Sequence, residues 1–200
     1  MVRLALAITG LILSASGIGA IFWKQELRYQ LPTPVPTNYN SIALGQAIAL
    51  PDDFKKGTAY FVHFYNPDCP CSRFNSRHVK SLIRAHEDSI QMVIVVPDEQ
   101  SFSKARNEFE DIPIVIDYQE SIVQATGVYS TPQAVIVDQH HRLYYRGNYN
   151  KSRYCTAKAT NFAELALVAL LNQQPSPQFG LIATQSYGCE WGKESEIELF

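Results

Sequence analysis

The sequence predicts an α/β domain carried behind an apolar amino-terminal helix. Between residues 60 and 171, segments with strand composition alternate with segments of helical spacing, in the order β, α, β, α, β, α, β, β, α. Alternation of this kind is typical of a sheet flanked by helices. Roughly 160 residues follow the first helix and its linker, which is enough for one well-buried domain and too few for two ordinary ones.

Each expected element rests on a local pattern. Aromatic and β-branched runs predict strands at 60–65, 90–96, 112–116, after Thr131-Pro132 and at 142–146. Helical spacing predicts helices at 72–87, 99–109, 119–126 and 161–171. The buried stripe of the first of these is expected to hold Phe74, Val79, Leu82 and Ile83. Asn161 and Glu164 have the spacing of a capping box. His63 and His78 are expected in the core, and His140 and His141 in solvent at a hairpin turn.

The amino terminus carries a membrane-length apolar run. Residues 4 to 23 contain no charge, follow Arg3 and end at Trp23 and Lys24. Twenty such residues span a bilayer as a helix. Small residues at 14–19 offer weak cleavage sites for a signal peptide, but the apolar run continues past them to an aromatic residue. This pattern favours an uncleaved transmembrane signal anchor.

We therefore expect four parts: a signal anchor at 1–24, a proline-rich linker at 25–41, the α/β domain at 42–172, and a tail at 173–200 that packs on the domain. Four cysteines favour an oxidising compartment. The expected location is a bacterial-type inner membrane, crossed once, with the domain on the periplasmic side. A net charge of −2 and a pI near 6.2 provide no basic field for nucleic acid.

The candidate reactive site is Asn66-Pro67-Asp68-Cys69-Pro70-Cys71-Ser72, where the first strand gives way to the first helix of the domain. Pro70 suits the first helical position, so Cys69 would be the helix cap. Helix N-termini favour thiolates, and cysteines there can fall from a pKa of roughly 8.5 to about 3.5 to 7.5. Asp68 opposes this effect, and the motif itself contains no Lys or Arg to offset it before Arg73. Cys69 is the candidate nucleophile.

This turn resembles the active-site turn of the thioredoxin-like superfamily, in which an apolar strand ends in Cys-x-x-Cys at a helix start. Cys69 matches the first cysteine of that motif. Ser72 stands at the second position, and Cys71 comes one residue early, which gives an atypical Cys-Pro-Cys-Ser motif. Thr131-Pro132 looks like the cis proline that packs against the active-site cysteine in that fold.

From Ala43 to Asn172 the chain is similar to membrane-tethered thioredoxin-like and redoxin proteins. The resemblance implies a thioredoxin-like fold, with a central mixed sheet flanked by helices. It also implies thiol-disulfide oxidoreductase activity on protein thiols and disulfides. The catalytic residues would be Cys69, Cys71 and Pro132. No cofactor and no metal is expected, and the membrane is contacted through residues 4–23.

The role of Cys71 stays open. A bridge from Cys69 to Cys71 satisfies the Cα separation of a disulfide, but residues two apart on a helix face different sides. Cys71 is otherwise an inert buried thiol or a partner of Cys69 as a soft ligand for Cu(I). Two further functions thus remain beside the oxidoreductase: a copper-binding or metal-delivery module, and a redox-silent binding domain.

Cys155 and Cys189 complete the set of thiols. The tail holds Phe179, Tyr187 and Trp191, whose burial requires that it dock on the domain. We expect a structural bridge from Cys155 to Cys189 that fastens the tail. Alternatively either thiol resolves a mixed disulfide on Cys69, or Cys189 bridges to Cys71. Four cysteines allow three full pairings, and sequence does not choose among them.

Overall fold

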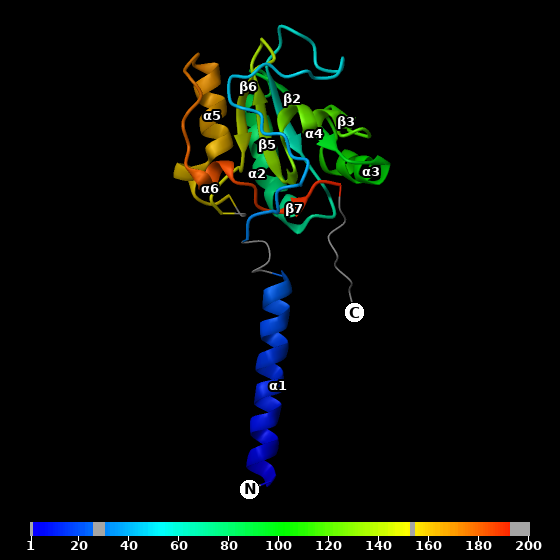
Figure 1. The fold of residues 1–200 in the computed structure, drawn as a ribbon, viewed down its shortest axis with the longest axis vertical. Coiled ribbons are helices and arrows are strands. Elements are labelled where there is room, and N and C mark those ends of the chain that lie inside the picture. Colours follow the sequence, from blue (N-terminus) through cyan, green and yellow to red (C-terminus); the bar gives the residue numbers. More distant parts are fainter. Residues whose placement is uncertain (1, 26–30, 153–154, 193–200) are drawn as a thin grey trace.

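The computed structural model describes residues 2–25, 31–152 and 155–192. Figure 1 shows one long helix, α1 (Val2–Gln25), and a separate domain built around a sheet. No side chain in the apolar stretch of α1 is covered by the rest of the molecule. Within the described residues α1 is the one helix long and apolar enough to cross a membrane, a property that signal sequences share.

The main sheet has five strands in the order β3-β2-β1-β5-β6. β1 lies at its centre, parallel to β2 and antiparallel to β5. β3 continues the parallel half, and β6 closes the antiparallel half. The strands are β1 (Tyr60–Phe64), β2 (Gln91–Val96), β3 (Ile114–Ile116), β5 (Gln133–Val137) and β6 (Leu143–Gly147). This mixed sheet confirms the predicted thioredoxin-like fold.

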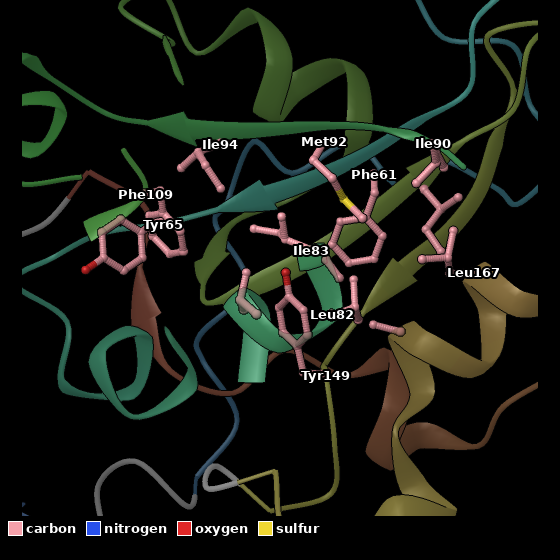
Figure 2. Packing of buried hydrophobic residues seen from close by; sticks show 14 of the residues in the cluster. Phe61, Tyr65, Leu82, Ile83, Ile90, Met92, Ile94, Phe109, Tyr149 and Leu167 are labelled. Carbon is pink, nitrogen blue, oxygen red and sulfur yellow. The ribbon is translucent and has the colours of Figure 1, made fainter. Parts of the chain in front are cut away.

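Helices cover both faces of the sheet. Alternate residues of β1 point to opposite faces, so Phe61 and Tyr65 join one core cluster while Val62 and Phe64 join the other. Figure 2 shows the first cluster, in which Leu82 of α2 and Leu167 of α5 pack with strand residues. The helices of the domain are α2 (Pro70–His86), α3 (Glu99–Glu108), α4 (Ser121–Thr126), η2 (Lys158–Thr160), α5 (Phe162–Leu171) and α6 (Leu181–Thr184).

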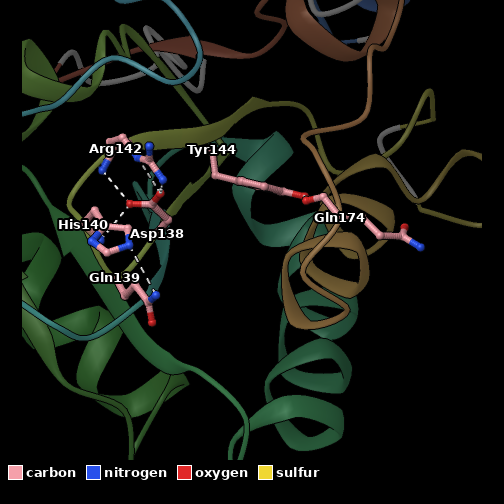
Figure 3. Close-up of polar contacts among 6 residues, drawn as sticks. All are labelled: Asp138, Gln139, His140, Arg142, Tyr144 and Gln174. Atoms are coloured by element: carbon pink, nitrogen blue, oxygen red, sulfur yellow. Dashed lines mark hydrogen bonds and ion pairs between the residues drawn. The ribbon is translucent and has the colours of Figure 1, made fainter.

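The turn between β5 and β6 is held by one carboxylate. Asp138 accepts hydrogen bonds from the backbone N–H groups of His140 and Arg142 and forms an ion pair with the Arg142 guanidinium (Figure 3). His140 is exposed as expected. His141 is buried, contrary to expectation, because its ring packs on Tyr60 and its Nε2 lies 3.2 Å from a backbone carbonyl oxygen.

Two other local expectations were wrong. Phe74 is 45 % exposed, whereas Val79, Leu82 and Ile83 are buried. The buried face of α2 starts at Cys71 and continues through Asn75, and Phe74 lies outside it. The capping box is also absent. The Asn161 side chain donates to the carboxylate of Glu164 and caps no backbone N–H of α5.

His63 lies in the core, as predicted. Its side chain is 1 % exposed, and its Nδ1 is 2.8 Å from the hydroxyl of Tyr149. Burial lowers the pKa of His63 from 6.5 to about 3, and the Gln133 backbone opposes part of this shift. The folded protein therefore holds His63 neutral at pH values where the unfolded chain would protonate it.

This difference predicts a loss of stability in acid. Below pH 6.5 the unfolded state binds a proton that folded His63 refuses, so stability falls by up to about 1.4 kcal/mol per pH unit down to about pH 4. Denaturant unfolding of the full chain in detergent at several pH values measures this slope. His63→Gln should flatten it by nearly that amount, whereas the exposed control His140→Gln should not. An unchanged slope in His63→Gln would contradict the assignment.

Candidate functional site

The Cys69 turn forms as the sequence predicts. After β1, the Asn66 carbonyl oxygen accepts a hydrogen bond from the Cys69 N–H, and the Asn66 side chain accepts one from Asp68 N–H. These bonds close a tight turn. Cys69 then caps α2 with extended backbone angles, and Pro70 occupies the first turn. The Cys69 sulfur is thereby placed at the amino-terminal end of a 17-residue helix, where unpaired N–H groups favour negative charge.

The charge of Asp68 is balanced by a residue that the sequence did not point to. Lys104 of α3 forms an ion pair with Asp68, with 2.6 Å between nitrogen and oxygen. The two side chains are 43 % and 37 % exposed, so the pair adds little to stability. Its effect at the site is to offset a negative charge next to Cys69, which the local sequence left unopposed.

The segment around Thr131-Pro132 lies next to the cysteine turn. The Thr131-Pro132 peptide bond is cis, as predicted, and lies between the two-residue strand β4 (Ser130–Thr131) and β5. The Thr131 carbonyl oxygen is 3.4 Å from the Cys69 sulfur. That oxygen can accept the S–H of Cys69 when the thiol is reduced.

Cys69 is bridged to Cys189 of the tail. The two Cα atoms are 5.9 Å apart and the residues are separated by 120 positions in sequence. Cys71 takes no part in this disulfide and belongs to the same buried cluster. All three are nearly inaccessible, at 0 % for Cys69, 5 % for Cys71 and 8 % for Cys189. The site therefore gathers three sulfurs of one chain, two joined to each other and one outside the disulfide.

The expected bridge from Cys155 to Cys189 is wrong. Cys155 is a free thiol whose sulfur donates to the Asn75 side-chain oxygen at 2.9 Å, next to α2. The apolar tail residues dock in two places, with Phe179 against Phe162 and Trp191 against Phe64. The second contact carries Cys189 to the Cys69 turn and away from Cys155. Burial demanded that the tail dock, but it did not say where.

The docked part of the tail is a strand. β7 (Cys189–Glu190) pairs antiparallel with β4, so that Cys189 lies opposite Thr131. The Trp191 N–H extends the pairing by donating to the Tyr129 carbonyl oxygen at 3.0 Å. Cys189 is thus held in place both by the disulfide and by the strand pairing with β4.

The residue before Cys189 must be small. Gly188 has a φ of +139°, and a Cβ built on it would lie 2.1 Å from the Thr131 carbonyl oxygen. No side chain fits at that distance, and the backbone angle itself is rare outside glycine. The Gly-Cys pair in the tail motif was the signal in the sequence for this close approach.

The linker after α1 contacts the other edge of the tail strand. The Thr33 N–H donates to the Ser186 carbonyl oxygen at 2.9 Å, and the Thr33 hydroxyl donates to the Gly188 carbonyl oxygen at 3.3 Å. Pro32 and Tyr187 form an antiparallel bridge. The tail strand is therefore flanked by Ser130–Thr131 on one side and by the linker on the other.

The segment that precedes the tail strand, residues 182–186, is bound to the domain independently of the disulfide. The Gln133 side chain donates to the Ser186 hydroxyl at 2.6 Å. The Asn148 side chain donates to the carbonyl oxygens of Ile182 and Gln185. Residues 182–186 are therefore attached to the domain through side chains of β5 and the β6 end. Residues 187–191 are held by the strand pairing, the linker, the Trp191 contact and the disulfide.

Across the described ranges, no three His, Cys, Asp or Glu side chains are grouped so as to hold a metal ion. Two of the three gathered sulfurs are joined to each other, and a disulfide sulfur is not a thiolate ligand. The arrangement present is a disulfide with a neighbouring thiol.

Cys155 should alkylate slowly at neutral pH. Burial raises its pKa to about 12, so its reaction with iodoacetamide should rise about tenfold per pH unit from pH 7 through pH 10. Peptide mass spectrometry of the full chain, alkylated before reduction, reads this directly and also maps the Cys69–Cys189 bridge. In the unfolded chain the rate should level off near pH 9. A plateau near pH 9 in the folded protein would contradict the burial of this thiol.

Comparison with known proteins adds a family and two solved folds. No curated protein matches the chain. A hypothetical protein from Sinorhizobium meliloti 1021 is 24 % identical, with a TM-score of 0.61 over 76 % of this chain and 97 % of that one. An uncharacterized conserved protein from Geobacillus kaustophilus is 22 % identical, with a TM-score of 0.62 over 80 % and 96 %. A more distant likeness, at 15 % identity and a TM-score of 0.45, is to the pneumococcal exposed lipoprotein thioredoxin from Streptococcus pneumoniae, over 59 % of this chain and 86 % of that one.

The family model described as Domain of unknown function (DUF6436) matches residues 40–191. The match continues past α5 and includes the tail strand with Cys189. Because it covers well over half of the chain, the protein belongs to the DUF6436 family.

Proposed function

We propose that this protein is a thiol-disulfide oxidoreductase that acts on protein thiols and disulfides through Cys69, with Cys189 as its resolving partner. The observation that carries the proposal is the Cys69–Cys189 bridge at the helix cap, beside the cis Thr131-Pro132 bond. A bridge that only fastened the tail would not need a helix N-terminus at one of its sulfurs. This placement supports a reactive rather than a purely structural bond.

The chemistry follows from the pair. In the reduced protein the Cys69 thiolate attacks one sulfur of a partner disulfide, forms a mixed disulfide and expels the other partner sulfur as a thiolate. Cys189 then attacks the Cys69 sulfur and expels the second partner thiolate. The partner gains two electrons and the enzyme ends with the Cys69–Cys189 bridge. A protein dithiol running the same steps in reverse restores the reduced pair.

The surroundings of Cys69 support roles for the remaining residues. The α2 N-terminus stabilises the Cys69 thiolate as nucleophile and as leaving group, and Lys104 offsets Asp68 next to it. Pro132 shapes the peptide that brings the Thr131 carbonyl within 3.4 Å of the Cys69 sulfur. Cys71 packs on the bridge from the first turn of α2 and serves as an auxiliary thiol that can also attack a mixed disulfide.

Cysteine variants separate these roles. The full chain is reduced, freed of reductant and mixed with excess disulfide-bonded peptide, and thiol release is followed in a single turnover. Cys69→Ser should slow the first step by about a hundredfold or more, because the nucleophile is gone. Cys189→Ser should keep that step but accumulate a mixed disulfide on Cys69. Cys71→Ser should reduce the rate only partly.

The matched control is Cys155→Ser, which removes a buried thiol outside the site and should leave the rate unchanged. Undiminished reduction by Cys69→Ser would remove the basis of the proposed reaction. Equal losses in Cys69→Ser and Cys71→Ser would assign the two thiols a shared role in place of a nucleophile and an auxiliary.

We further propose that residues 1–24 anchor the protein in a bacterial-type inner membrane and that 25–41 link the anchor to a periplasmic domain, 42–172, and its tail, 173–200. The length and apolar character of α1 support the anchor. The disulfide supports an oxidising compartment. Residues 193–200 of the tail lie outside the described residues.

Reporter fusions test the orientation. A reporter that is active only outside the cytoplasm, joined after Phe200, should be active, and one that is active only inside should be silent. The membrane fraction should retain the fusion after a high-salt wash, because the anchor is uncleaved. Activity of the cytoplasmic reporter alone would reverse the proposed orientation.

A further inference from the structure

We propose that the position held by the tail strand is also the docking position for partner proteins, and that it selects extended segments with glycine immediately before the reactive cysteine. This inference rests on the proposed oxidoreductase function and specifies its substrate. The chain's own tail is the resident occupant and shows what the position accepts.

The position is bounded by backbone on two sides. Thr131 pairs with Cys189 on the sheet side, and the Trp191 N–H bonds to the Tyr129 carbonyl oxygen there. On the opposite side the Thr33 N–H and hydroxyl reach the carbonyl oxygens of Ser186 and Gly188. A segment held along both edges must be extended, because only a strand presents hydrogen-bonding groups in both directions.

The preference for glycine follows from one distance. At the place of Gly188, a Cβ would lie 2.1 Å from the Thr131 carbonyl oxygen and 3.0 Å from its carbon. Both atoms belong to the backbone beside the cis bond, so they cannot turn aside as a flexible side chain would. A partner segment that delivers its sulfur to Cys69 in the same register therefore meets the same restriction.

The tail can leave this position without unfolding the domain. Ser186 is held by Gln133, and Asn148 holds the carbonyl oxygens of Ile182 and Gln185. When a dithiol reduces the Cys69–Cys189 bond and is itself oxidised to a disulfide, residues 187–191 lose their disulfide cross-link to the domain. The strand pairing, the linker contacts and the Trp191 contact remain, and all of these are non-covalent. Residues 187–191 can then swing about Ser186 and give their place to a partner strand.

The test compares two peptides on the full-length Cys189→Ser variant in detergent. One has the sequence of residues 185–192, and the other has alanine in place of its glycine; each carries its cysteine as a mixed disulfide with thionitrobenzoate. The Cys69 thiolate attacks the peptide sulfur, the new disulfide joins peptide to protein, and thionitrobenzoate leaves as a coloured thiolate. We expect the glycine peptide to react faster by about tenfold or more.

Control reactions show which step and which residue the peptide rates report on. Reduced wild-type protein is run in parallel, so the comparison does not depend on the folding of one variant. The free dithiobis-nitrobenzoate reports the intrinsic reactivity of Cys69, and mass spectrometry places each adduct. Thr33→Val removes the hydroxyl that reaches the Gly188 carbonyl. It should lower the rate of the glycine peptide, relative to the small disulfide, by about threefold.

The outcomes separate the two proposals. Equal rates for the two peptides, or reaction with the small disulfide alone, would overturn the docking inference and leave the oxidoreductase function standing. No adduct on Cys69 with any of the three reagents would overturn the function itself. A glycine preference that Thr33→Val does not alter would remove the linker from the docking position.

Discussion

The site depends on one covalent bond, between Cys69 and Cys189, which joins residues 120 positions apart. Without it the tail strand is held by a two-residue ladder, the linker contacts and the Trp191 contact, none of which is covalent. The bond brings together the end of β1, the start of α2, the cis-proline strand, the linker and the tail. Each contributes a local geometry that is common by itself. Their meeting at one sulfur distinguishes this turn from an ordinary strand-to-helix junction.

Local chemistry made half of this site predictable. Cys69 follows an apolar strand and precedes a proline that suits a first helical turn, so its place at the α2 cap can be derived from neighbours alone. Thr131-Pro132 precedes an apolar run, and its resemblance to the cis proline was confirmed. The strands and helices around the sheet were predictable for the same reason, because each segment shows the hydrophobic periodicity of its own secondary structure.

The other half depends on distances that no local pattern contains. Lys104 contacts Asp68 from another helix, 36 positions away in sequence. The residues near Asp68 therefore do not reveal the counterion of its carboxylate. The need to bury the tail aromatics does not distinguish Phe64 from Phe162 as the residue they pack on. The sequence therefore does not identify Cys69, rather than Cys155, as the partner of Cys189. His141 was placed in solvent because hairpin turns are polar, while its ring is packed on Tyr60.

The wide separation of the bridged cysteines also matters while the chain is being made. At about 5 to 20 residues per second, Cys69 is synthesised roughly 6 to 24 seconds before Cys189 exists. During that interval Cys71 and Cys155 are the thiols of the same chain that can capture it. Cys71 lies two residues along a helix, where side chains diverge, and Cys155 becomes a poor nucleophile once burial raises its pKa. Once α2 and the domain have formed, neither bystander thiol is well placed to pair with Cys69 instead of Cys189.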